Sequence, residues 1–168
     1  MAFLEVKNVK KVYTTRFGTN KVEALKNVNF TAEKGEYLAI MGESGSGKTT
    51  LLNVLASIDK ASSGKIILNG KEMDTIKDKE LAQFRREHLG FVFQDFNLLD
   101  SFTLGENICL PLVLAGKKYP QIEPQLQEVA RKVNITELLG KYPYEVSGGQ
   151  KQRAAVCRAI ITRPELIL

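Results

Sequence analysis

Eight consecutive residues, Gly42 to Thr49, have the types and the spacing needed to bind phosphate, and they match the pattern G-x-x-x-x-G-K-[ST]. Gly42, Gly45 and Gly47 let the backbone curl, so that consecutive amide groups face an anion at the positive end of a helix dipole. Lys48 supplies a charge for the β- and γ-phosphates, and the Thr49 hydroxyl is a ligand for Mg²⁺. An ordinary glycine turn would not require a lysine followed by a hydroxyl, so the sequence predicts a nucleoside triphosphate site. The residues predicted to bind the cofactor here are Gly42, Ser44, Gly45, Ser46, Gly47, Lys48, Thr49 and Thr50.

A second glycine-rich element, at residues 146–153, reads Val-Ser-Gly-Gly-Gln-Lys-Gln-Arg. The phosphate loop alone fits kinases, GTPases and many ATPases equally, so this second element is needed to choose among these classes. A serine N-cap and two glycines that open a helix form another helix N-terminus able to face an anion. The alternative is a purely structural role, since the same residues would also cap a helix that binds no ligand. The element resembles the signature of the ATP-binding-cassette (ABC) ATPases, with Val146 where leucine is usual.

The resemblance to the ABC ATPases covers the whole chain and implies ATP and Mg²⁺ as cofactors. In this family two nucleotide-binding domains pair head to tail, and each signature closes over the triphosphate in the partner's phosphate loop. A second copy of the domain is therefore an expected partner. The residues that would contact ATP across such a dimer are Ser147, Gly148, Gly149 and Gln150.

Two further residues are assigned a role only by this resemblance. Gln94, at the end of Phe-Val-Phe-Gln, matches the glutamine that contacts the metal and the attacking water, although a glutamine at a strand end is otherwise a routine polar cap. Lys48 and Gln94 are thus the candidate catalytic residues, and Thr49 and Gln94 the candidate metal ligands. Tyr13 matches the aromatic residue that stacks on adenine, although a lone tyrosine in a β-region more often packs in the fold.

The family pattern continues beyond Pro164 and Glu165 into an aspartate that holds Mg²⁺ through water and a glutamate that acts as general base. The chain reads Leu-Ile-Leu at residues 166–168, where that apolar strand begins. We therefore expect a domain truncated before the Walker B acidic residues. Such a chain would bind nucleotide without efficient hydrolysis.

The elements that must position these residues alternate between strands and helices. Apolar residues alternate through residues 3–30 and predict short antiparallel strands. A compact apolar run, residues 37–41, predicts a buried strand that leads into the phosphate loop. The helical spacing of Leu51, Leu52, Leu55 and Ile58 predicts a helix after it. Asn69-Gly70 predicts a tight hairpin turn. The expected fold is α/β, a P-loop NTPase core of mixed sheet with an N-terminal antiparallel β-subdomain, incomplete at the C-terminus.

From residue 95 onward the pattern is mostly helical. Thr103 to Glu106 is a capping box, and apolar residues repeat at helical spacing over residues 126–133. This region resembles a helical subdomain inserted into the core. The predicted division is a β-subdomain and P-loop core at 1–94, a helical subdomain ending in the signature at 95–150, and the signature helix with the start of the next strand at 151–168.

Composition excludes several other classes. The chain has 168 residues, of which 43% are hydrophobic and 26% charged, which fits one globular domain and not a collagen, a disordered chain or a disulfide scaffold. The net charge of +5 is spread without a basic run, so nucleic acid is not an expected partner. Cys109 and Cys157 have no metal-ligand spacing, and no apolar run is long enough to span a membrane.

The resemblance implies a subunit that energises a transporter, lies in the cytoplasm and associates with the inner face of the cell membrane through a transmembrane permease. Residues 96–99 would help to form the groove for a permease helix, or would belong to the helical core. The residues of the motifs most resemble those of the family branch that serves macrolide export, lipoprotein release and peptide-antibiotic efflux. A soluble ABC ATPase without a transport role, and a non-catalytic nucleotide-binding fragment, are the alternatives. The sequence identifies neither the transported substrate nor the direction of transport.

Overall fold

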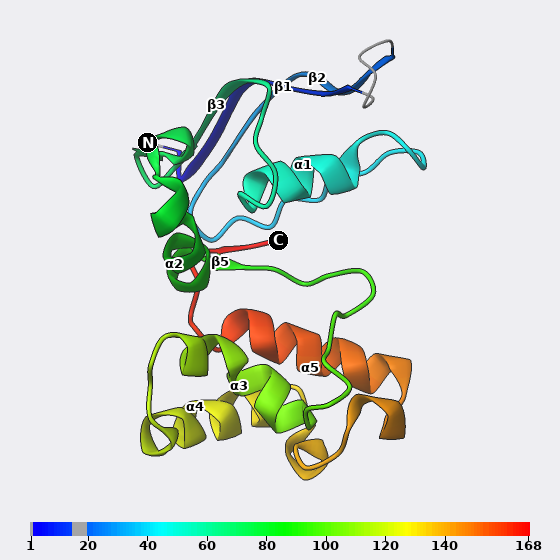
Figure 1. Ribbon diagram of the computed structural model, residues 1–168, viewed down its shortest axis with the longest axis vertical. Helices are drawn as coiled ribbons and strands as arrows, with labels where there is room; N and C mark the ends of the chain where they lie inside the picture. The colour runs from blue at the N-terminus through cyan, green and yellow to red at the C-terminus, as the bar shows by residue number, and fades with distance from the viewer. Residues whose placement is uncertain (1, 15–19) are drawn as a thin grey trace. The chain divides into compact units, whose positions relative to one another are not determined.

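The computed structural model describes residues 2–14 and 20–168 (Figure 1). The chain forms two compact units, Met1–Leu81 and Ala82–Leu168. The helix α2, Asp78–His88, contains the boundary between them. Among the described residues, no helix is both long and apolar enough to cross a lipid bilayer. The division of the chain predicted at residues 94 and 150 stays a prediction.

The first unit contains, within the described residues, a four-stranded antiparallel sheet of order β2-β1-β3-β4. Its strands are β1 Leu4–Thr14, β2 Lys21–Ala32, β3 Ser63–Leu68 and β4 Lys71–Glu72. The helix α1, Lys48–Leu55, and a short 3-10 helix, Met73–Thr75, complete the regular structure before α2. Alternate side chains of β1 and β3 are buried, as the alternation of apolar residues predicted. The predicted antiparallel β-subdomain is confirmed.

The hairpin between β3 and β4 turns at Asn69 and Gly70. Both residues have left-handed backbone angles, with φ of 48° and 78° respectively. Two consecutive left-handed residues are what a two-residue hairpin turn requires, and asparagine and glycine adopt that conformation at low cost. The predicted Asn-Gly turn is confirmed.

The prediction of a buried strand at residues 37–41 is wrong for this structure. The segment is irregular, and Tyr37 and Met41 are 94% and 88% exposed. A strand is stabilised by hydrogen bonds to a neighbouring strand, and none of the strands of the described residues pairs with this segment. An apolar run is therefore sufficient for a strand only where a second strand lies beside it.

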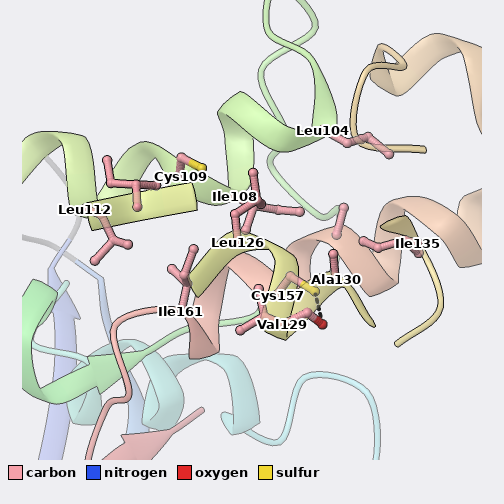
Figure 2. Packing of buried hydrophobic residues seen from close by; sticks show 12 residues of the cluster. Leu104, Ile108, Cys109, Leu112, Leu126, Val129, Ala130, Ile135, Cys157 and Ile161 are labelled. Carbon is pink, nitrogen blue, oxygen red and sulfur yellow. Dashed lines mark hydrogen bonds between the residues drawn. The ribbon is translucent and has the colours of Figure 1, made fainter. Parts of the chain in front are cut away.

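The second unit is mainly helical. Its elements are β5 Leu89–Gly90, α3 Leu104–Leu114, α4 Tyr119–Lys132, two 3-10 helices at Thr136–Leu138 and Pro143–Glu145, α5 Gly148–Ile160 and β6 Leu166–Ile167. β5 and β6 pair in parallel over two residues each, Leu89 with Leu166 and Gly90 with Ile167. α3, α4 and α5 bury a shared core (Figure 2), formed by Leu104, Ile108, Cys109, Leu112, Ile122, Leu126, Val129, Ala130, Ile135, Ala154, Cys157 and Ile161.

The start of α3 is fixed by polar contacts. Thr103 and Glu106 form the predicted capping box: the Thr103 hydroxyl accepts from the Glu106 amide, and the Glu106 carboxylate accepts from the Thr103 amide. Asn107, which is fully buried, accepts from the Leu99 amide at 2.7 Å and donates to the Leu99 carbonyl at 3.0 Å. The side-chain amide of Asn107 thus supplies the hydrogen-bond partners for both backbone groups of Leu99, and it holds the preceding loop in one conformation. The loop that carries residues 96–99 is therefore tied to the helical core.

Candidate phosphate-binding site

The phosphate loop enters α1 through two glycines with left-handed backbones. Gly45 has φ of 81°, and Gly47, the N-cap of α1, has φ of 91°. A Cβ at Gly47 would lie 2.4 Å from the carbonyl oxygen of Ala24 and 3.2 Å from the side chain of Leu25, both in β2. Glycine is required at position 47 because both the backbone angle and the packing exclude a side chain. The loop is thereby seated against the sheet.

Lys48 is the first residue of α1, and its ammonium lies on the loop. Nζ donates to the carbonyl oxygens of Gly42 at 2.8 Å and Glu43 at 2.6 Å, and lies 3.4 Å from Ser46 Oγ. Thr49 follows it, exposed, and Thr50 is half-buried, both in the first turn of the helix. The first-turn amides of a helix have no partner inside the helix, and no acidic side chain stands in this first turn. The arrangement therefore offers the charge of a half-buried lysine, a hydroxyl and helix amides to an anion.

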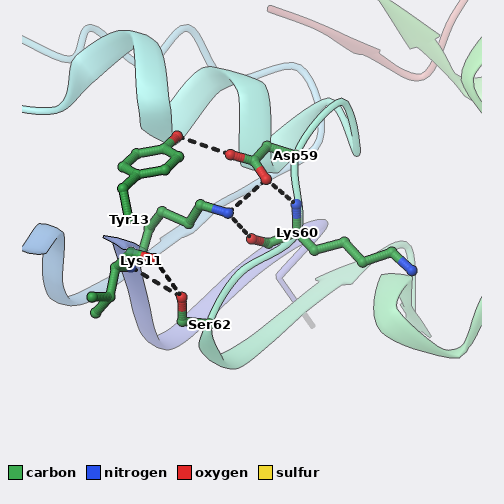
Figure 3. Close-up of polar contacts among 6 residues, drawn as sticks. Lys11, Tyr13, Asp59, Lys60 and Ser62 are labelled. Carbon is green, nitrogen blue, oxygen red and sulfur yellow. Dashed lines mark hydrogen bonds and ion pairs between the residues drawn. The ribbon is translucent and has the colours of Figure 1, made fainter. Parts of the chain in front are cut away.

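Tyr13 lies near the end of β1 and is 42% exposed (Figure 3). Its hydroxyl donates to Asp59 Oδ2 at 2.8 Å. In the same strand Lys11 pairs with Leu25, whose side chain would lie 3.2 Å from a Cβ at Gly47. The strand of the predicted base-stacking tyrosine and the phosphate loop are thus joined through β2. The sequence held no motif that indicated Asp59, because its contact with β1 spans 46 residues of chain.

The signature element begins α5 in the second unit. Ser147 is the N-cap, and its Oγ accepts from the Gln150 amide at 3.4 Å, while the Gln150 side chain accepts from the Ser147 amide at 2.8 Å. Gly148 and Gly149 are exposed, and a Cβ at either would meet open space. The four residues thus form the capped helix start predicted from the sequence. Their predicted role toward a partner's nucleotide stays a prediction.

Gln94 also belongs to the second unit and is exposed in the segment after β5. The turn that follows it has left-handed backbone at Phe96 and Asn97, with φ of 60° and 46°. The guanidinium of Arg158, from the last turn of α5, donates to the carbonyl oxygens of both residues at 2.6 Å. Burial lowers the pKa of Arg158 from its usual value. Sequence reasoning missed this contact, which ties the Gln94 segment to the helix that starts with the signature.

Among residues 2–14 and 20–168, cysteine and acidic side chains form neither a reactive thiol nor a metal cluster that could serve as a second site. Cys109 and Cys157 are buried, and desolvation raises the pKa of each to about 11. A thiol with so high a pKa is a poor nucleophile at neutral pH. Within the described residues, no group of three or more His, Cys, Asp or Glu side chains is placed to hold a metal. The phosphate loop is therefore the candidate site of this chain.

A glycine-rich loop that passes through an N-capping glycine into a lysine-led helix beside a sheet defines the phosphate-loop class of nucleotide-binding folds. Residues 25–168 match the family described as ABC transporter. The chain belongs to this family, and its fold is that of an ABC cassette. The family resemblance of the two glycine-rich motifs is confirmed.

Several curated relatives are similar over nearly the whole chain. The bacitracin export ATP-binding protein BceA of Halalkalibacterium halodurans is 53% identical over 99% of this chain and 65% of its own length. The ABC transporter ATP-binding protein YxdL of Bacillus subtilis is 52% identical over 98% of this chain and 63% of its own length. The methionine import ATP-binding protein MetN 1 of Bacillus cereus is 44% identical over 98% of this chain and 47% of its own length. This chain thus spans less than two thirds of the length of these relatives.

Solved structures show the same fold. The ATP-binding cassette MJ0796, in a dimeric post-hydrolysis state bound to ADP and Pi, superposes with a TM-score of 0.89 at 36% identity. The match covers 98% of this chain and 72% of that chain. A second dimeric structure of MJ0796, described as a bacterial ABC transporter cassette, matches equally well.

Proposed function

We propose that this chain binds ATP with Mg²⁺ and is the nucleotide-binding part of an ABC transporter, which it energises through ATP-driven closure of a dimer. The observation that carries the proposal is the phosphate loop, in which the Lys48 ammonium lies on the loop at the start of α1. Family membership supports the choice of ATP over other triphosphates. Relatives named for bacitracin export and for methionine import are both similar, so the proposal names no transported substrate.

The residues of the loop fit a triphosphate. In the proposed complex Lys48 exchanges the loop carbonyls for phosphate oxygens, and the amides of the first turn of α1 face the same oxygens. Thr49, exposed in that turn, is placed to offer its hydroxyl to Mg²⁺, which neutralises charge on the phosphate oxygens when bound. Gln94 is proposed as the second metal ligand, and it belongs to the unit that also carries the signature. These groups bind and orient the nucleotide, and none of them is a general base.

The proposed partners are a second nucleotide-binding domain and a membrane permease. Ser147 to Gln150 would contact the nucleotide of the second domain, and a dimeric cassette among the structural neighbours supports this pairing. Association with a permease would place the chain at the cytoplasmic face of the membrane. The relatives named as ATP-binding proteins of export and import systems support this location.

The proposed adenine contact at Tyr13 is tested by Tyr13→Ala. We expect this variant to bind ATP more weakly by roughly tenfold, since stacking of a base on an aromatic side chain contributes about 1–3 kcal/mol in nucleic-acid complexes. The control is Tyr144→Ala, which removes a tyrosine that is 69% exposed in the second unit. Isothermal titration calorimetry with Mg-ATP measures both affinities. Equal affinities for the two variants would contradict the assignment of Tyr13.

A further inference from the structure

Asp59 is a carboxylate that contacts the side chains of Lys11 and Tyr13 near the end of β1 (Figure 3). It stands in the loop that connects α1 to β3. Oδ2 accepts from the Tyr13 hydroxyl at 2.8 Å, and Oδ1 accepts from Lys11 Nζ at 2.6 Å. The same carboxylate therefore determines where the ring of Tyr13 and the charge of Lys11 lie.

The loop holds this carboxylate in place through its own backbone. The amides of Ile58 and Asp59 both donate to the carbonyl oxygen of Asn53 in α1, at 2.9 and 3.2 Å. Asp59 Oδ1 also accepts from the Lys60 amide at 2.8 Å. Asp59 is thus anchored to the helix that begins with the phosphate loop, so that one short helix connects the phosphate site with the support of Tyr13.

A second contact joins the loop to β1 itself. The Ser62 amide donates to the carbonyl oxygen of Lys10 at 2.8 Å, and Ser62 Oγ accepts from the Val12 amide at 3.0 Å. These two hydrogen bonds of Ser62 hold the loop on the strand and do not involve Asp59. Removal of the Asp59 side chain is expected to leave the loop on the strand.

Lys11 is the second support of the ring. Its side chain is 12% exposed, and Nζ also donates to the Lys60 carbonyl oxygen at 2.8 Å. Nζ lies 4.9 Å from the centroid of the Tyr13 ring, within the range of a cation–π contact. The hydrogen bond from Lys11 is the main cause that lowers the pKa of Asp59, and the Tyr13 hydroxyl lowers it further against the effect of burial. At neutral pH the cluster is therefore an ion pair with a tyrosine bound to it.

We propose that Asp59 is a positioning residue for the base of the nucleotide: with Lys11 it fixes the ring of Tyr13 in one orientation before ATP binds. The inference rests on the proposed function, in which Tyr13 stacks on adenine. Lys11 approaches one face of the ring, so the opposite face is the one presented to the base. A ring fixed in advance loses less conformational freedom on binding than one that rotates freely.

The test compares a ligand that carries the adenine base with one that has only the triphosphate. Mg-ATP and magnesium tripolyphosphate are titrated into the wild-type chain and into Asp59→Ala by calorimetry. We expect Asp59→Ala to bind ATP roughly three- to tenfold more weakly, the effect of one or two net hydrogen bonds. Its affinity for tripolyphosphate is expected to stay within about twofold, because Tyr13 contacts the base alone.

Two further variants make the test specific. Asp78→Ala removes a carboxylate that pairs with Lys60 of the same loop and is 78% exposed, and it is expected to change neither affinity. Lys11→Met removes the charge below the ring and keeps the side-chain stem, and it is expected to show the same selective loss as Asp59→Ala. If Asp59→Ala does not fold, Lys11→Met carries the test alone.

The outcomes separate this inference from the proposed function. Loss of ATP affinity in Tyr13→Ala without any loss in Asp59→Ala would overturn the role of Asp59 and leave the contact of Tyr13 intact. Equal losses for ATP and tripolyphosphate in Asp59→Ala would show a merely structural role and would also overturn it. Unchanged ATP affinity in Tyr13→Ala would remove the base contact itself, and the positioning role with it.

Discussion

A polypeptide of residues 1–168 is expected to hydrolyse ATP about 10²–10⁴-fold more slowly than a chimera in which the same residues are continued by the remainder of the BceA relative. The residues proposed to hold the nucleotide are Lys48, Thr49 and Gln94, and none of them is assigned as a general base. By resemblance, the base and the acidic metal partner follow the strand that begins at Leu166. A general base supplied by the continuation would alone account for a difference of this size.

The measurement is phosphate release from ATP by the two purified polypeptides at matched concentration and saturating Mg-ATP. The chimera with Lys48→Ala is the control for phosphatase contamination, because its rate should fall to the background. Comparable turnover by residues 1–168 and by the unmodified chimera would show that the chain supplies its own base, and the proposed assignment would then be wrong.

Replacement of Lys48 by alanine is expected to weaken the binding of Mg-ATP by about 100-fold. Lys48 Nζ already lies on the loop, bonded to two carbonyl oxygens, and in the complex it would bind phosphate oxygens instead. Hydrogen bonds to charged groups contribute about 1.5–3 kcal/mol each, and the upper half of this range corresponds to a loss of that size. The loss should be in affinity and not in folding, since Lys48 is at the surface of the loop.

The matched variant is Lys151→Ala, which removes a lysine from the first turn of α5. In the proposed function this turn contacts only the nucleotide that is bound by the second domain of a dimer. The affinity of the isolated chain for ATP should therefore change by less than about twofold. Titration of a fluorescent ATP analogue measures both variants under conditions in which the chain is monomeric. Equal losses in the two variants would contradict this division of roles.

Features specified by neighbouring residues could be predicted from the sequence. The hairpin turn at Asn69-Gly70 and the capping box from Thr103 to Glu106 depend on a few adjacent residues, and both are present. The phosphate loop is of the same kind, because its glycines and lysine act within one turn and the helix that follows. The family could be inferred because two such local motifs occur in one chain.

Features that depend on distant partners could not be predicted. The apolar run at residues 37–41 has the composition of a strand, yet a strand is decided by its neighbour, and the sequence does not show which segment lies beside it. Asp59 and Arg158 are single charged residues without a motif, and their contacts span 46 to 62 residues of chain. Their role in the candidate site is visible only once the strands and helices are in place.

The most direct test of the account is a titration of the isotopically labelled chain with Mg-ATP, followed by the NMR shifts of its backbone amides and tyrosine rings. The central claim is that residues 42–50 bind the triphosphate and that Tyr13 binds the base. The predicted result is that the amides of residues 42–50 and the ring of Tyr13 shift together with one affinity, while the amides of residues 147–150 stay unchanged in the monomeric chain. Saturable binding of ATP that leaves the amides of residues 42–50 unshifted would contradict the claim.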